Sequence, residues 1–534
     1  MQLDRSIGLV GLTFIAVGGV LGSGWLFAPL LAVEYAGPAA VIAWFIGAIA
    51  MLLLAMTFGE VTAILPVAGG LARIPYFSHG NLVAMIMGWT AWIGYVVAAP
   101  IEVSVLLQYL APAIPWAFYE PPDHGVLSLT LPGLGVASAL LVLLTVLNAF
   151  GVALFARINT ALTWAKIVLP IVIGITLIAS RFETANFEAA GGFMPYGVEG
   201  VFSAVSVGGI IFAFIGFRHA IDMAGETRRP QVTIPLALIL SLVICAAIYL
   251  LLQVAFIGAL DDADLVHAWK SFDFTHRYGP MGALAQALAM IWLVQLIVGA
   301  AIVGPFGAAL VSTGSDGRLV LALARNGFFA AIFTKLSRYG VPLNALILNT
   351  FAGVFALLVM PFHEIVAINS SSLTLALTTG PLALLALRYL APDEKRWFRL
   401  PCAPLLAGLA FVIATLIIYW SGWDTLWRLG IALVVGLAIF AYRNRRNEWA
   451  SLDFPGAAWL PPYVATIGVV SAFGTFGGGS GDIPFGWDVA ILAVVAVALL
   501  VVAVRGRISR ERYLQLRNQA SSEGDATADG ASNS

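Results

Sequence analysis

Residues 17–29 read VGGVLGSGWLFAP and lie in an apolar run that is otherwise long enough to cross a membrane. Glycine costs about 1 kcal/mol relative to alanine inside a helix, and proline lacks the N–H that a helix requires. Irregular backbone at membrane depth survives only where protein or a watery cavity satisfies its polar groups. This stretch therefore indicates either a binding site or a place where a neighbouring helix packs closely against small residues.

The composition is typical of a polytopic membrane protein. Of 534 residues, 60% are hydrophobic and 10% are charged, and the mean hydropathy is +0.95. A soluble domain would need more charge on its surface. The net charge of -1 argues against nucleic-acid binding, and Cys245 and Cys402 form no CxxC or metal motif. We therefore expect no cofactor, no metal and no nucleic-acid partner, and a lipid bilayer as the surroundings.

We expect about fourteen membrane-spanning helices, because a bilayer core takes about 20 apolar residues per helix. The first run starts at residue 7 and is too long for the hydrophobic region of a signal peptide, so we expect it to remain as an anchor. The segment 505–534 turns basic and then rich in Ser, Gly and Asp, which predicts a disordered tail. The apolar runs cover residues 7–31, 38–64, 82–111, 133–155, 160–180, 201–224, 234–258, 281–312, 342–360, 366–389, 403–420, 425–442, 462–479 and 487–504.

Basic residues indicate the orientation, because Lys and Arg favour the cytoplasmic side. Two of them, Lys166 and Arg218, lie within apolar runs. With the N-terminus inside, most of the 27 Lys and Arg residues fall on the cytoplasmic side, and the outer segments hold only Arg181, Lys270, Arg277 and Arg428. We expect an inner-membrane protein with both termini in the cytoplasm.

A second apolar run is interrupted in the same way. The sixth run contains VSVGGIIFAFIGFRHAIDMAG, Val205 to Gly225, with a glycine pair, an aromatic cluster and Gly216 near mid-depth. The first and sixth runs would then begin two units of five helices, as in transporters built from inverted repeats. An odd number of spans turns the second unit upside down relative to the first. The prediction rests on the segment count and the matched interruptions, not on residue identity.

A pair of broken helices suits a ligand that carries both a carboxylate and an ammonium group. The half-helix that starts after residues 22–24 would point N–H groups and its positive dipole end at the break, where a carboxylate binds. The half-helices that end at the breaks would offer C=O groups to an ammonium. Phe212 and Phe217 are candidates to close over the ligand, although aromatic residues at helical spacing are also ordinary packing.

Four motifs carry a resemblance to a known family. GSGWLFAP, FGEVTAILPVAGG, FAFIGFRHAIDMAGETRRPQVTIP and DGRLVLALARNGFF, in this order within residues 5–400, resemble the amino acid, polyamine and organocation permease superfamily. The resemblance implies an all-α membrane protein with a 5+5 inverted-repeat core like that of the leucine transporter. The units would be 1–180 for helices 1–5, 181–400 for helices 6–10, 401–504 for four accessory helices, and 505–534 for a cytoplasmic tail.

The resemblance also implies roles for single residues. Gly22, Ser23 and Gly24 match the unwound part of helix one that holds the substrate carboxylate. The segment 212–217, with Phe212, Phe214, Gly216 and Phe217, matches the unwound part of helix six, and Phe212 takes the aromatic-gate position.

Lys166, in NTALTWAKIVLP, resembles a lysine that replaces a sodium ion in family members that couple transport to protons. A desolvated lysine can release its proton within a useful pH range, which makes this role chemically sensible. The alternative is a lysine that extends to the cytoplasmic face near the start of its helix.

Arg218 departs from the family pattern, in which an acidic residue often follows the GF of helix six. An arginine cannot carry out the titration of an acid, but it can bind a second carboxylate of the substrate. This favours aspartate or glutamate as substrate, and SAFGTFGGGSGDIPFGWD resembles a bacterial subgroup that includes aspartate-proton symporters. Alternatively, Arg218 simply pairs with Asp222 one helical turn away.

The sequence thus predicts a proton-coupled amino-acid permease without enzyme activity, with acidic amino acids as the favoured substrates. A neutral amino-acid permease, an exchanger and a membrane sensor that binds without transporting remain alternatives. FHEIVAIN has Ala367 where a zinc-protease motif needs its second histidine, and the chain has no Walker loop. Glu60 is expected to be structural, and Glu102 either partners Arg218 or lines the transport path. Oligomeric state is left open.

Overall fold

The computed structural model of the protein describes residues 5–67, 69–119, 128–150, 152–261, 265, 269, 278–444 and 452–529. Within these ranges, the side chains of 152–157, 363, 443–444 and 520–529 are not described. Of the basic residues that indicate the orientation, Lys270, Arg277, Arg445 and Arg446 lie outside the described ranges.

The described chain is almost entirely helical, because a long apolar segment in a bilayer must satisfy its backbone hydrogen bonds within itself. The one described strand pair, β1 (Phe118–Tyr119) and β2 (Ser128–Leu129), is antiparallel. Up to residue 226 the helices are α1 (Leu9–Val20), α2 (Gly24–Ala36), η1 (Gly37–Ala39), α3 (Ala40–Ile64), α4 (Gly70–His79), α5 (Asn81–Tyr109), η2 (Pro115–Ala117), α6 (Leu131–Ala149), α7 (Val152–Ser180), η3 (Thr184–Phe187), α8 (Gly197–Ser206), α9 (Ile210–Phe214), η4 (Ile215–Phe217), α10 (Arg218–Asp222) and η5 (Ala224–Glu226).

The second part of the chain continues the helical pattern. Its helices are α11 (Pro230–Ala259), α12 (Gly279–Ala287), α13 (Ile291–Arg325), η7 (Ala331–Thr334), α14 (Leu343–Val359), α15 (Phe362–Leu377), α16 (Thr379–Leu390), α17 (Ala403–Trp420), α18 (Trp423–Asn444), α19 (Phe454–Ala457), α20 (Leu460–Phe473), α21 (Trp487–Arg505) and α22 (Arg510–Asp529).

Eleven spans of the described chain are long and apolar enough to cross a membrane, which confirms a multi-pass membrane protein. The pair Gly197–Ser206 and Ile210–Asp222, bent by 40°, would make twelve. Leu9–Val20 and Leu343–Val359 are apolar but shorter, the first because the chain breaks after Val20. The number of fourteen spans therefore stays a prediction.

Three predicted boundaries differ from the structure. The apolar run 281–312 is divided into α12 and α13, with a turn at Leu288–Met290, and α13 continues to Arg325 beyond the predicted end. The run 462–479 is helical only to Phe473, because its C-terminal part is rich in glycine. The tail predicted to be disordered carries α22, whose Tyr513 is buried and whose Arg510 pairs with Asp393 at 2.6 Å.

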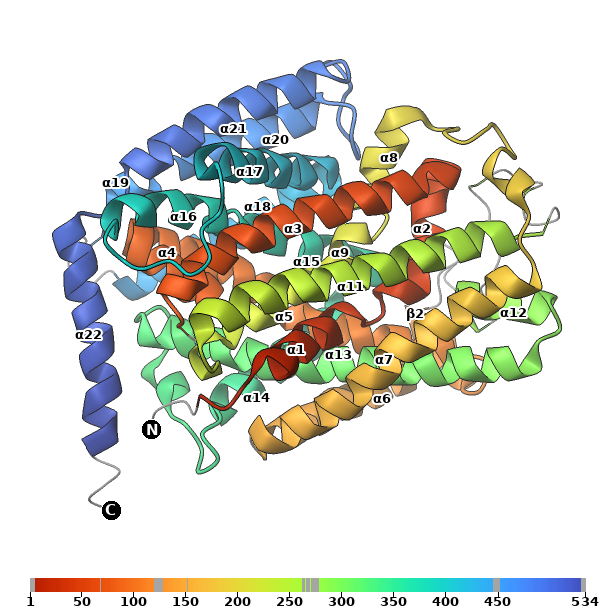
Figure 1. Cartoon of the computed structure of the whole chain (residues 1–534), viewed down its shortest axis with the longest axis horizontal. Coiled ribbons are helices and arrows are strands. Elements are labelled where there is room, and N and C mark those ends of the chain that lie inside the picture. The colour runs from red at the N-terminus through yellow and green to blue at the C-terminus, as the bar shows by residue number, and fades with distance from the viewer. Residues whose placement is uncertain are drawn as a thin grey trace.

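The long helices lie side by side along the longest axis of the molecule (Figure 1). In the core, α3 packs on α11, and α5 packs on α13 and α15. The C-terminal helices α20 and α21 lie along one edge of the view and α6 and α7 along the opposite edge (Figure 1). The helix α17 packs on both α21 and the core helices α3 and α16.

Two broken helices cross at the centre, backbone against backbone. The chain leaves the helical path between Val20 and Gly24, and again between Ser206 and Ile210. A methyl group on Gly216 would collide with the backbone of Gly19, and one on Gly24 would lie 2.6 Å from Ala213 Cβ. Close packing thus accounts for Gly24 and Gly216, so small-residue packing and a broken helix occur together here.

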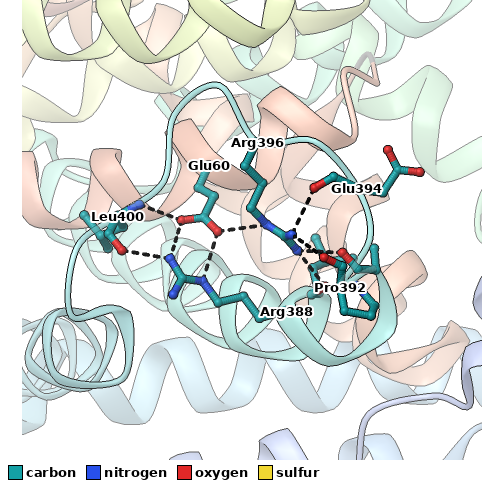
Figure 2. Close-up of polar contacts among 8 residues, drawn as sticks. Glu60, Arg388, Pro392, Glu394, Arg396 and Leu400 are labelled. Carbon is teal, nitrogen blue, oxygen red and sulfur yellow. Dashed lines mark hydrogen bonds and ion pairs between the residues drawn. The ribbon is translucent and has the colours of Figure 1, made fainter.

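A buried carboxylate ties α3 to the segment between α16 and α17 (Figure 2). Glu60, fully buried near the end of α3, accepts hydrogen bonds from Arg388 Nε at 3.0 Å and Arg388 Nη2 at 2.8 Å. It also accepts one from Leu400 N at 2.7 Å, and Arg396 Nε lies 3.1 Å from its Oε1. The structural role expected for Glu60 therefore has a physical basis, because its carboxylate binds three residues: Arg388 of α16, and Arg396 and Leu400 of the segment that follows.

Replacing Glu60 with Gln should lower stability strongly. The substitution leaves two arginines without their carboxylate, and breaking a buried ion pair typically costs roughly 3–5 kcal/mol. The matched control is Arg510→Ala, which breaks an ion pair whose side chains are 57% and 81% exposed. Its effect should be below about 1 kcal/mol. The midpoint of thermal unfolding in detergent measures both, and equal shifts would contradict the role given to Glu60.

Replacing Gly216 with Ala should also impair folding, because the added methyl group meets the Gly19 backbone, which cannot rotate away as a side chain can. Overpacking of this kind costs about 1–3 kcal/mol or more. Gly468→Ala in α20 is the control, since nothing lies within 4 Å of the added methyl group. A fluorescence-detected gel-filtration profile after heating compares the two. If both variants resisted heating equally well, the contact between Gly216 and the backbone of Gly19 would have to be less tight than the structure shows.

Candidate functional site

The break between α1 and α2 borders a small cavity in the centre of the bundle, and the helical segment that follows the second break lines it as well. The cavity has a volume of about 20 Å³ and is lined by residues of α1, α2, α5, α9, η4, α10, α13 and α15. Glu102, Phe212, Arg218 and His219 are among the side chains that line it. A space of this size holds about one water molecule. An amino acid could enter only if the surrounding helices moved apart.

The break between α1 and α2 leaves a backbone N–H group without a helical partner. A carboxylate of the protein accepts a hydrogen bond from this group. Ser23 N donates to Glu102 Oε2 at 2.7 Å, and both residues are buried. Glu102 lies on α5, and its Oε1 fills the space where a side chain on Gly22 would be. Gly22 is therefore required for the approach of Glu102. Ser23 is the N-cap of α2 and Gly24 its first residue, so the second half-helix starts one residue earlier than predicted and Gly24 is helical.

The carbonyl groups at the end of α1 are bound by side chains of other helices. Lys166 Nζ of α7 donates to Gly18 O at 2.5 Å, and Lys166 is 2% exposed. The hydroxyl group of Tyr249 in α11 donates to Val20 O at 2.6 Å and lies 3.1 Å from Ala213 O of α9. Lys166 thus does not extend to the cytoplasmic face, and Tyr249 connects the two broken helices.

Arg218 lies between two carboxylates and an aromatic ring. Its Nη1 is 3.8 Å from Asp222 Oδ2 and 3.6 Å from Asp316 Oδ1, and its guanidinium carbon is 3.5 Å from the ring centre of Tyr95. The Tyr95 hydroxyl group donates to Asp222 Oδ2 at 2.5 Å. Within the described chain, Nε and Nη1 of Arg218 have no hydrogen-bond partner. The pairing with Asp222 is therefore present, and Asp316 shares it.

Two further contacts continue this cluster along α13. His219 Nδ1 lies 2.6 Å from Ser315 Oγ, so its ring is hydrogen-bonded in the core. Arg318 binds Glu226 through Nε at 2.7 Å and Nη2 at 3.2 Å. Since α13 runs to Arg325, Arg318 is a buried residue of this helix, beyond residue 312 where the eighth apolar run was predicted to end.

The segment expected to unwind in helix six is more regular than predicted. The main bend falls at Val207–Gly209, where Gly209 has a φ of +80°, ahead of the predicted segment. Residues 210–214 are α-helical and 215–217 form a 3-10 turn. The glycine pair Gly208–Gly209 therefore makes the bend, because glycine tolerates positive φ without strain.

The aromatic residues of this segment have different surroundings. Phe212 lines the cavity, whereas Phe214 is fully buried against Trp44 and Tyr249, with ring centres 5.7 and 5.2 Å apart. Phe217 is also fully buried and belongs to the main apolar core. Of the two candidate gates, Phe212 is the one placed at the cavity.

Two residues of the site were not singled out from sequence. Tyr95 and Asp316 face Arg218, but no spacing relates either to α10, and the predicted end of the eighth run left Asp316 in a loop. Glu102 was noted without a definite partner. Its spacing on α5 could not reveal the bond to Ser23, because the two residues are 79 positions apart in the chain.

Comparison with known proteins gives consistent matches. The family model of the amino acid permeases matches residues 7–440. The glutamate/serine transporter AimA of Bacillus subtilis is 33% identical over 98% of this chain and 97% of its own length. The aspartate-proton symporter of the same organism is 33% identical over 93% of this chain and 96% of its own length.

The branched-chain amino acid permease BcaP of Bacillus subtilis is 27% identical over 84% of this chain and 94% of its own length. These matches mean that the chain is a transport protein for amino acids and not an enzyme. With a family model over residues 7–440 and relatives aligned along nearly its whole length, the protein belongs to the amino acid permease family.

Proposed function

We propose that the protein is a proton-coupled amino-acid symporter of the inner membrane that binds its substrate between the two broken helices. The observation that carries the proposal is the chemistry of the first break: an ammonium group binds the carbonyl of Gly18, and a carboxylate binds the N–H of Ser23. An amino acid carries the same two groups. The similarity to an aspartate-proton symporter supports the coupling to protons.

The proposal includes the 5+5 arrangement, with residues 1–180 and 181–400 as inverted units, residues 401–504 as accessory helices and both termini in the cytoplasm. The interruptions in the first and sixth apolar runs support it. In such transporters, rocking of one bundle of helices against the other opens the site to each side in turn. The small volume of the cavity fits a closed conformation between the two open ones.

Lys166 is proposed as a proton-coupling residue. Its charged group is buried on the carbonyl end of α1, where a cation offsets the negative end of the half-helix. Loss of its proton would remove the charge, weaken the bond to Gly18 O and so loosen α1 from α7. Opening of the site would require α1 to move. A protonated Lys166 holds α1 more firmly and would therefore favour the closed conformation.

Acidic amino acids are the proposed substrates, with Arg218 as the group that binds the side-chain carboxylate. Arg218 lines the cavity, and its Nε and Nη1 make no hydrogen bond within the described chain, which supports this role. The similarity to a glutamate/serine transporter and to an aspartate-proton symporter supports it as well. A neutral substrate is the second candidate, because Asp222 and Asp316 already neutralise Arg218 and the name of one relative includes serine.

Uptake into proteoliposomes tests the function. Labelled aspartate, glutamate, serine, leucine and arginine are offered with and without an inward proton gradient. Wild type should accumulate aspartate or glutamate only with the gradient. Arg218→Ala should reduce uptake of the acidic substrates at least about tenfold, since a charge-assisted hydrogen bond contributes roughly 1.5–3 kcal/mol. Lys166→Ala should abolish the response to the gradient.

The control for Arg218→Ala is Arg428→Ala, which removes a partly exposed arginine far along the chain that pairs with Glu364 at 2.9 Å. Its uptake should equal that of wild type. Preference for serine or leucine, unchanged in Arg218→Ala, would assign Arg218 to structure and make the protein a neutral amino-acid permease. Binding of label without any uptake would indicate a sensor, and uptake of label only against preloaded amino acid would indicate an exchanger.

A further inference from the structure

The carboxylate position of the proposed substrate site is occupied by Glu102. The first N–H of the second half-helix, that of Ser23, is where a substrate carboxylate would bind, and Glu102 Oε2 accepts it at 2.7 Å. Glu102 lines the cavity and is 6% exposed. The absence of a side chain at Gly22 makes room for the carboxylate, whose Oε1 lies in that space.

Using a buried charged residue to accept a hydrogen bond from an N–H group has a large desolvation free energy. An uncharged side chain such as Ser, Asn or Gln can accept the same hydrogen bond. Burial of a carboxylate costs several kcal/mol unless other charges compensate it. The presence of an acid at this position is therefore better explained by a task that needs a group able to take up a proton.

The charges around Glu102 do not balance. Lys166 of α7 and Tyr249 of α11 interact electrostatically with Glu102, and Cys245 of α11 lies beside Tyr249. Arg218 and His219 of α10 line the same cavity, and Asp222 and Asp316 pair with Arg218. When His219, Cys245 and Tyr249 are counted as neutral, three carboxylates face two cations. One additional proton in this cluster would make it neutral.

We propose that Glu102 is a tethered competitor of the substrate carboxylate, and that its displacement from Ser23 N is coupled to its protonation. The inference rests on the proposed function and assigns one coupled proton to a residue. Two carboxylates that share one site cannot both stay ionised in a low-dielectric interior. When the substrate carboxylate takes the N–H of Ser23, an O–H bond forms on Glu102 with a proton from the external solution, and no other bond breaks.

This exchange predicts how substrate binding depends on pH. If binding takes up one proton, the dissociation constant of the substrate should fall up to about tenfold for each unit by which the pH is lowered. Glu102→Gln keeps an acceptor for Ser23 N but cannot take up a proton. Glu102→Ala removes the competitor altogether, so it should bind substrate more tightly than wild type at high pH.

The experiment measures binding of labelled aspartate, glutamate and serine to the purified full-length protein at a series of pH values on both sides of neutrality. Wild type should show the pH dependence, and both Glu102 variants should show little of it. Counterflow at equal pH should persist in Glu102→Gln, while accumulation driven by a proton gradient should be lost. Ser104→Ala, a buried substitution two positions along α5, is the control and should retain the wild-type slope.

The outcomes separate this proposal from the general function. A wild-type slope in Glu102→Gln would overturn the proposal while leaving amino-acid transport intact, and so would pH-independent binding by wild type. Failure of wild type to bind or transport any of the three amino acids would instead contradict the proposed function. If Glu102→Ala does not yield folded protein, the Gln variant, which has almost the same shape, decides the question alone.

Discussion

The structure depends on one constraint: a helix that breaks within a membrane leaves backbone polar groups that something must bind. In this protein, side chains from three other helices form hydrogen bonds with the backbone groups at the break between Val20 and Gly24. Glu102 of α5 binds the N–H of Ser23, Lys166 of α7 binds the carbonyl of Gly18, and Tyr249 of α11 binds the carbonyl of Val20. Any movement that opens the break must release some of these bonds.

This arrangement explains why charged residues occur at such depth. An ammonium of the protein lies at the C-terminal end of α1 and a carboxylate at the N-terminal end of α2, on the two sides of the break, each where the helix dipole favours its charge. An amino acid presents the same pair of groups, which is why we propose that it binds at this break. Arg218, held by Asp222, Asp316 and Tyr95, places a further charged cluster beside the cavity.

A second set of ionic contacts connects helices away from the cavity. Glu226 binds Arg318 between η5 and α13, and the backbone of Ile7 pairs with that of Glu226 and Arg228. Glu60 binds the segment after α16 (Figure 2). These bonds fix the N-terminal segment and the end of α3 to their neighbours.

The sequence by itself determined the membrane class, most of the helices, the break after Val20 and the presence of two basic residues, Lys166 and Arg218, inside apolar segments, because hydropathy, glycine clusters and isolated charges are local signals. It also identified the resemblance to permeases that the family match confirms. It misplaced the bend of helix six, the ends of α13 and the state of the tail, since helix ends depend on packing with distant segments. Only the tertiary structure decided that Glu102 meets Ser23 and that Asp316 and Tyr95 enclose Arg218. Those contacts join residues far apart in the chain, and no periodicity within one helix can specify which face of another helix it will meet.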